Sequence, residues 1–242
     1  MMNSYEVRLK GCEEVAAGTF AFHFEKPSGF HFKPGQAIDL VLPDPAPPSG
    51  RYLARHTFSL VSAPFQDELV IATRMRDSPF KRAIKSLSAG AIVRLEGPFG
   101  SLTLHGDRAR PAVLVAGGIG VTPFVSMLRQ AAREQLPQRI LLLYANRRPE
   151  DAAFLVELRQ LEQRYKYFHL IATMTQATKS ALAWDGRAGQ IDEDMLRRAC
   201  SELDAPVYYV AGPPGMVEAM RDVLIDLGVN EDAIRSEEFF GY

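Results

Sequence analysis

The amino-acid sequence predicts two domains: a small antiparallel β-barrel or sandwich, then an α/β domain with a doubly wound parallel sheet. The chain has 242 residues, which is long enough for two domains of ordinary size. Before residue 106, short alternating apolar runs are separated by glycine and proline. After it, continuous apolar runs alternate with helical patterns. We therefore expect domains at residues 1–106 and 107–242, joined by a short polar link.

The first half carries the pattern of several short strands. Alternation and aromatic or β-branched residues predict strands at residues 5–9, 19–24, 37–42, 57–62, 68–73 and 92–95. The stretch 43–50 has four prolines in eight residues and is expected to be a surface loop.

The second half alternates strands with helices. Four continuous apolar runs, at 112–116, 140–144, 168–172 and 207–211, fit a parallel sheet buried on both faces. Helical spacing of apolar residues predicts helices at 123–133, 149–163 and 213–227, each with a proline near its first turn.

Composition argues against several classes of protein. The chain is 47% hydrophobic and 24% charged, close to an average globular protein, and its net charge of −1 disfavours a nucleic-acid binder. Two cysteines, Cys12 and Cys200, are too few for a zinc cage or a thiolate-bound iron–sulfur cluster. We see neither a secretory signal nor an apolar run long enough to cross a membrane. The expectation is a soluble, cytoplasmic enzyme.

The strongest local motif is AGGIGVTP at residues 116–123, which follows an expected strand and opens an expected helix. Gly118 and Gly120 would let the backbone approach a ligand, and the helix N-terminus would favour a pyrophosphate. Pro123 stands where the usual dinucleotide fingerprint has glycine. An ordinary strand–helix turn is the alternative interpretation.

Two motifs of the first half also suggest ligand contacts. In RHTFSL, residues 55–60, the ring of Phe58 could cover a flavin while the next hydroxyl reaches its polar edge; a core position is the alternative for Phe58. In RMRDSPFK, residues 74–81, Asp77 or Ser78 could cap a short helix that starts at Pro79. That cap, with the basic residues around it, would suit a phosphate, or the segment is a solvated basic turn.

Together the motifs resemble the ferredoxin–NADP reductase family of flavoprotein reductases, in order and over nearly the whole chain. The matching elements are FKPGQ at 32–36, HTFS at 56–59, EGPFG at 96–100, GIGVTP at 118–123 and GPPGM at 212–216. The resemblance implies an antiparallel β-barrel that binds FAD and an α/β domain that binds NADPH or NADH.

The resemblance also assigns residues to roles. It implies that Phe58 lies against the flavin ring and that Ser59 acts near flavin N5, while Glu237 or Glu238 helps to position the nicotinamide. The remaining flavin contacts would come from His56, Thr57, Arg74, Arg76, Asp77, Ser78, Pro79, Phe80 and Lys81. The nucleotide contacts would come from Gly118, Gly120, Thr122, Pro123, Gly212, Pro213 and Met216. One of the terminal aromatics Phe239, Phe240 and Tyr242 would shield the flavin.

Three departures from the family pattern bear on which residues contact the flavin phosphate and on where the electrons go. His56 stands where many members have arginine, and Arg55 is expected on the opposite face of its strand, so Arg74 or Arg76 would supply the charge at the flavin phosphate. Ala211 replaces a frequent cysteine. Because no clustered cysteines follow the reductase core, electrons would pass to a separate acceptor.

Nucleotide preference rests on three arginines. Arg147 and Arg148 follow the second α/β strand, near the expected adenosine ribose, and Arg187 is a further candidate. These charges favour NADPH; surface arginines are the alternative.

The expected reaction is hydride transfer from NAD(P)H to FAD and delivery of electrons to a partner such as ferredoxin or flavodoxin, by a monomer. Reduction of free flavin or ferric complexes, and a non-catalytic nucleotide-binding subunit, are the alternatives. A methyltransferase-type domain would leave the motifs of the first half unexplained.

Overall fold

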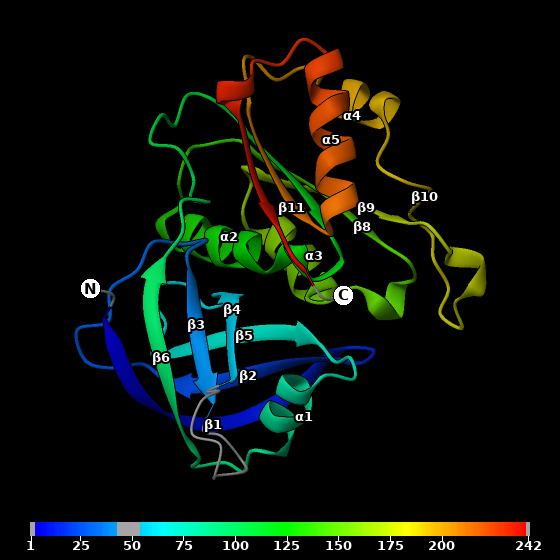
Figure 1. Ribbon diagram of the computed structural model, residues 1–242. Helices are drawn as coiled ribbons and strands as arrows, with labels where there is room; N and C mark the ends of the chain where they lie inside the picture. The colour runs from blue at the N-terminus through cyan, green and yellow to red at the C-terminus, as the bar shows by residue number, and fades with distance from the viewer. Residues whose placement is uncertain (1–2, 43–53, 241–242) are drawn as a thin grey trace.

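A computed structural model describes residues 3–42 and 54–240, and the two sheets that the sequence predicts are both present (Figure 1). The expected proline-rich loop at 43–50 and Tyr242 lie outside the described residues. The last strand of the first sheet ends at Phe99, and the first strand of the second begins at Ala112. The expected boundary at residue 106 falls in the segment between them.

The first sheet is antiparallel, with strand order β4-β3-β6-β1-β2-β5. Its elements are β1 (Ser4–Ala16), β2 (Thr19–Glu25), β3 (Ala37–Leu42), β4 (Ala54–Ser59), β5 (Glu68–Arg74), α1 (Pro79–Ser86) and β6 (Ile92–Phe99). Just beyond β4, Leu60 bridges Ile71 of β5, and the Val61 amide donates to the Val70 carbonyl at 2.8 Å. These contacts join the two edge strands, so the sheet closes into the predicted barrel.

The second sheet is parallel, with strand order β10-β9-β8-β7-β11-β12. Its strands are β7 (Ala112–Gly117), β8 (Ile140–Asn146), β9 (Phe168–Met174), β10 (Arg187–Ala188), β11 (Val207–Gly212) and β12 (Ile234–Glu238). The edge strands β10 and β12 are elements that the sequence pattern did not predict. β10 has two residues and β12 carries mostly polar ones, so neither forms an apolar run.

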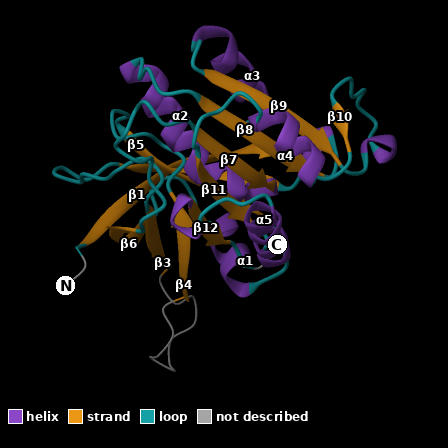
Figure 2. Cartoon of the chain, turned by 90° about the horizontal axis from the view of Figure 1, so that it is seen from above, coloured by secondary structure: helices purple, strands orange, loops and turns teal. Residues whose placement is uncertain are grey.

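Helices cover both faces of this sheet (Figure 2). One apolar cluster contains residues of α2 (Thr122–Glu134) and α3 (Leu155–Arg164). Another contains residues of α4 (Glu193–Cys200) and α5 (Pro214–Asp226). The predicted doubly wound arrangement is therefore confirmed. α4 was not predicted, because only Met195 and Leu196 are buried on it.

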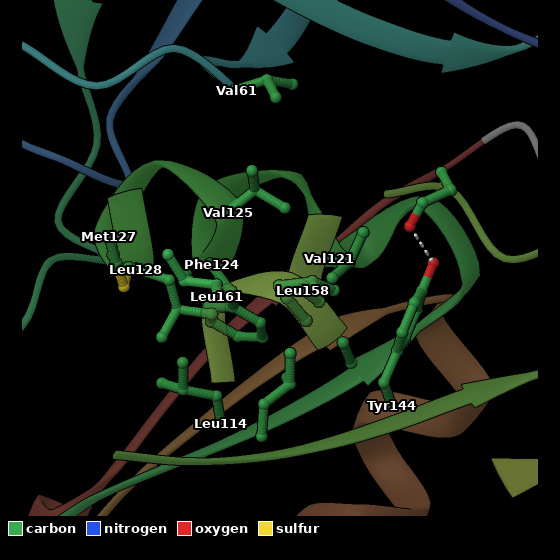
Figure 3. Close-up of a cluster of buried hydrophobic side chains, with 14 of the residues drawn as sticks. Val61, Leu114, Val121, Phe124, Val125, Met127, Leu128, Tyr144, Leu158 and Leu161 are labelled. Atoms are coloured by element: carbon green, nitrogen blue, oxygen red, sulfur yellow. Dashed lines mark hydrogen bonds between the residues drawn. The ribbon is translucent and has the colours of Figure 1, made fainter. Parts of the chain in front are cut away.

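The two domains share one apolar core. Val61 and Leu102, from the barrel side, belong to the same buried cluster as Val125 and Met127 of α2. Figure 3 shows Val61 across from Val125 on that helix. Beside this contact, the Ser126 hydroxyl donates to the Ser62 carbonyl at 2.6 Å. The barrel is thus packed directly on one helix of the α/β domain.

Within residues 3–42 and 54–240, no helix is long and apolar enough to cross a lipid bilayer.

Candidate functional site between the two domains

A cavity of about 540 Å³ lies at the junction of the domains. The barrel contributes Thr19, Arg74 and Arg76, and the α/β domain contributes Gly117, Gly118, Ile119, Ala145, Asn146, Arg147, Asp151, Ala153, Thr175, Gln190, Ile191, Pro213, Gly215, Met216, Ala219 and Met220. The cavity is therefore a feature of the two-domain arrangement, since neither domain encloses it alone.

Sheet topology explains where the cavity lies. The chain leaves β7 toward β8 on one side of the sheet, and β11 pairs with β7 on the other side. At such a reversal the connections leave in opposite directions, which opens a crevice at the carboxyl ends of the strands. Gly117 at the end of β7 and Pro213 just after β11 both line it. The two glycine motifs thus meet at one site.

The two predicted glycines of the first motif have different tasks. Gly118 lines the cavity with φ of +54° and open space where a side chain would be, so it gives the backbone access to a ligand. Gly120 is buried, and a Cβ there would lie 2.3 Å from the Ala211 carbonyl oxygen. The expectation that Gly120 admits a ligand is therefore corrected: its missing side chain lets this turn pack against β11.

Thr122 and Pro123 are buried and lie outside the cavity lining. The Thr122 hydroxyl donates to the Ile119 carbonyl at 3.0 Å, which braces the turn from inside. Of the second motif, Pro213 and Met216 line the cavity, while Gly212 packs behind them: a Cβ on Gly212 would lie 3.2 Å from the Gly117 nitrogen. These residues shape the walls of the site.

The predicted arginines separate into two groups. Arg74, Arg76 and Arg147 line the cavity, but Arg148 and Arg187 do not. Arg148 is held in a two-point ion pair with Asp151, at 2.9 and 3.1 Å. Arg187 is exposed on β10, where its carbonyl accepts from the Trp184 indole at 2.7 Å. A role for Arg187 at the nucleotide has no support from its position.

An aromatic group lies on β4 and α1. The His56 ring lies 4.8 Å from that of Phe80, and the Phe58 ring lies 5.8 Å from Phe80, centroid to centroid. Burial, with a contribution from the Lys81 ammonium, lowers the pKa of His56. Thr57 points to the other side of the strand, where its hydroxyl donates to Asp39 at 2.5 Å, as strand alternation requires.

Arg55 also lies on that other side, paired with Asp39 at 2.5 Å and Glu96 at 2.8 Å. Its charge is therefore directed away from the aromatic group, in the orientation that the sequence suggested.

The turn before α1 is a helix cap with basic neighbours. The Ser78 hydroxyl accepts from the Lys81 amide at 3.2 Å, and Pro79 occupies the first turn. Asp77 is ion-paired with Arg82. The Lys81 ammonium is buried and donates to Thr73 and to the Arg74 carbonyl; burial, with Arg76 nearby, lowers its pKa to about 8. The cap is formed by Ser78, not by Asp77.

Ser59 has an unusual environment. It is 3% exposed, and its hydroxyl has no hydrogen-bond partner within the described residues. Buried hydroxyls without partners are rare in proteins because each carries a desolvation cost. A ligand with a polar edge would supply the missing partner.

The chain end lies beside the second glycine motif. Glu237 pairs in register with Ala211, and the Phe239 amide donates to the Gly212 carbonyl at 2.9 Å. Burial raises the pKa of the Glu237 carboxyl. Phe239 packs against the shared core, whereas Phe240 is 72% exposed. Of the described aromatics here, Phe240 presents its ring to solvent.

Several lining residues were missed at the sequence level. Asn146 ends β8 and Thr175 follows β9, so the rule that ligands bind at the carboxyl ends of parallel strands could have found both. Thr19 of the barrel and Gln190 carry no signal of this kind, because tertiary packing brings them to the site.

The residues fit a dinucleotide and a flavin. The cavity offers free arginines and an open glycine backbone, which suit phosphates. Phe58 is buried in the apolar core of the barrel. The Ser59 hydroxyl, on the opposite face of the strand by alternation, has no hydrogen-bond partner within residues 3–42 and 54–240 and could meet the polar edge of a flavin.

Comparisons with known proteins agree with this geometry. Residues 114–222 match the oxidoreductase NAD-binding domain family. Ferredoxin–NADP reductase B of Sorangium cellulosum is 28% identical over 245 residues, covering 97% of each chain. The chain is similar to this ferredoxin–NADP reductase along nearly its whole length. The predicted resemblance is thereby confirmed.

The fold is shared more widely than the sequence. A ferredoxin–NADP reductase from Neisseria gonorrhoeae, solved with bound FAD and NADP, superposes with a TM-score of 0.80 at 22% identity, covering 98% of this chain and 99% of that one. Reductase component 2 of terephthalate 1,2-dioxygenase from Comamonas is 27% identical over 201 residues, or 79% of this chain. The chain spans 59% of the length of that relative.

Proposed function

We propose that this protein is an FAD-dependent NAD(P)H oxidoreductase that passes electrons to a separate acceptor. The observation that carries the proposal is the cavity between the domains, with barrel arginines on one side and the Gly117–Gly118 turn on the other. Such a site brings a nucleotide held by the α/β domain to a cofactor held by the barrel. The flavin, when bound, supplies the hydride acceptor and the store from which electrons leave.

The chain's own residues hold and orient these groups. The backbone at Gly118 faces the nucleotide phosphates, with Arg76 and Arg147 supplying positive charge. Phe58 supports one face of the flavin ring, and the Ser59 hydroxyl hydrogen-bonds its polar edge. Glu237, on β12 beside the second glycine motif, positions the nicotinamide; burial raises the pKa of its carboxyl.

NADPH is the proposed preferred nucleotide. Arg147 is exposed at the end of β8, lines the cavity and forms no ion pair within the described residues. An arginine after the second strand of such a sheet is well placed for a ribose 2′-phosphate.

The acceptor is proposed to be a ferredoxin or flavodoxin that docks on a monomer of this protein. Support comes from the names of the relatives, which include a ferredoxin–NADP reductase and a reductase component of a dioxygenase.

An anaerobic absorption spectrum tests the proposal directly. Purified protein loaded with FAD should bleach on addition of NADPH, and more slowly with NADH. Reoxidation is then assayed with ferredoxin, flavodoxin, free FMN and a ferric chelate. Failure to retain FAD, or retention without bleaching by either nucleotide, contradicts the proposed activity. Equal catalytic efficiency with NADH contradicts the preference for NADPH, and reoxidation by FMN or the chelate alone contradicts a protein acceptor.

A further inference from the structure

Asp151 is a buried carboxylate in the wall of an otherwise cationic cavity. Its side chain is 2% exposed, and it belongs to the cavity lining together with Arg74, Arg76 and Arg147. A carboxylate repels the phosphates that such a site would bind, so we expect it to have another role. Its contacts identify that role.

Asp151 holds two arginines at once. Its Oδ1 accepts from Arg74 Nη2 at 3.2 Å, which links β5 of the barrel to the α/β domain. The same carboxylate accepts from Arg148 Nε at 2.9 Å and from Arg148 Nη2 at 3.1 Å. The neighbouring arginines lower the pKa of Asp151, so it stays ionised. One buried charge therefore partners two cations.

A second carboxylate completes the cluster. Glu150 lies 3.3 Å from Arg148 and accepts from the Ser180 hydroxyl at 2.6 Å. The charges of Arg74, Arg148, Asp151 and Glu150 sum to zero. Among the described residues, Arg76 and Arg147 remain without a carboxylate partner, so they carry the net charge that a phosphate meets.

We infer that Asp151 is a specificity-determining residue. By pairing with Arg148 it neutralises that arginine and holds it away from the ribose 2′-phosphate, which limits the affinity of the site for NADPH. This inference rests on the proposed function and deepens it. Arg148 follows β8 directly after Arg147, at the position where a 2′-phosphate is read in such sheets. With Asp151 in place, Arg147 is the one of these two arginines left to bind that phosphate, so the preference for NADPH over NADH is moderate.

The expected size follows from Coulomb's law. For a buried carboxylate, with an effective dielectric constant of about 20 and a separation of about one Debye length, removal of the negative charge favours a phosphate dianion by about tenfold. NAD⁺ lacks the 2′-phosphate, so its affinity should change much less. The ratio of the two dissociation constants therefore isolates the effect.

The test is isothermal titration calorimetry of the FAD-loaded protein with NADP⁺ and with NAD⁺, which needs no turnover. Asp151→Asn should improve the ratio in favour of NADP⁺ by about tenfold. Glu150→Gln, at a more exposed position, should improve it by about two- to threefold. Asp151→Glu retains the charge and should stay within about twofold of the original ratio. Asp194→Asn, the same change in an exposed ion pair on α4, should leave it unaltered.

Thermal melting of each variant first establishes that it is folded. An unchanged ratio in folded Asp151→Asn overturns the inference, as does an equal gain for NAD⁺. If Asp151→Asn does not fold, Glu150→Gln decides the matter by the same criterion. These failures leave nucleotide binding by the original protein intact, so they are distinct from failure of the proposed function, in which neither nucleotide binds.

Discussion

Replacement of Ser59 by alanine should have opposite effects on the flavin-free and the flavin-bound protein. The hydroxyl is buried, at 3% exposure, and has no hydrogen-bond partner in residues 3–42 and 54–240. An unsatisfied buried polar group costs about 1–3 kcal/mol, so Ser59→Ala should stabilise the flavin-free protein by about 1 kcal/mol. With FAD bound, the same hydroxyl gives a hydrogen bond worth about 0.5–1.5 kcal/mol. Both effects weaken binding, by about 1.5–2.5 kcal/mol together, so the dissociation constant for FAD should rise roughly 10- to 70-fold.

Three measurements test the prediction for Ser59→Ala. Urea denaturation of the flavin-free protein gives the free energy of unfolding, fluorescence titration gives the affinity for FAD, and stopped-flow absorbance gives the rate of flavin reduction, which should fall. Ser62→Ala is a matched control, because Ser62 is equally buried but its hydroxyl accepts from the Val70 amide at 3.0 Å. That control should destabilise the protein by about 1–3 kcal/mol and leave FAD affinity unchanged.

The reasoning is refuted if Ser59→Ala destabilises the flavin-free protein as much as Ser62→Ala does. Such a result would mean that the Ser59 hydroxyl is satisfied without the flavin. Unchanged FAD affinity together with an unchanged rate of flavin reduction would remove Ser59 from the flavin site altogether.

Two further predictions concern the glycine turn and the basic helix. Gly120→Ala should lower the free energy of unfolding by roughly 1–3 kcal/mol or more, because the new Cβ would meet the Ala211 carbonyl. Gly118→Ala is strained only by its positive φ and should cost about 1–2 kcal/mol. Equal urea midpoints for the two variants would contradict this order. The pKa of Lys81 is about 8 in the fold and near 10.5 when unfolded, so the unfolded chain binds the proton more tightly. Flavin-free protein should therefore gain stability from about pH 8 to 10.5, and a rise of the same size in Lys81→Met would rule out this lysine as its source.

Local pattern predicts most of this fold. The strands β7, β8 and β11 are buried on both faces, and a continuous apolar run is the direct signature of that burial, whereas β9 is only partly buried. The missed elements lack such runs. α4 buries only Met195 and Leu196, and Asp192 caps its first turn. β12 lies at the edge of the sheet and carries mostly charged or polar residues. Its pairing with β11 therefore depends on the rest of the sheet having formed.

The site was predictable where it depends on motifs and less so where it depends on contacts between distant residues. Gly118, Pro213 and Met216 were expected and line the cavity. The withdrawal of Arg148 by Asp151 is an i,i+3 pairing that sequence spacing permits but does not require. The pairing of Arg74 with Asp151 joins residues that are 77 apart in the chain, and only folding brings them together.

The core that spans both domains has a consequence for how such proteins can be rebuilt. Val61 and Leu102 on one side and Val125 and Met127 on the other belong to one buried cluster, so a cut at residue 106 would divide a packed interior and leave apolar surface on both pieces. If the α/β domains of two relatives were exchanged, the barrel side chains that pack against them would have to be exchanged as well. The two halves of this protein are therefore tied to each other by their packing, and each side of the contact constrains changes in the other.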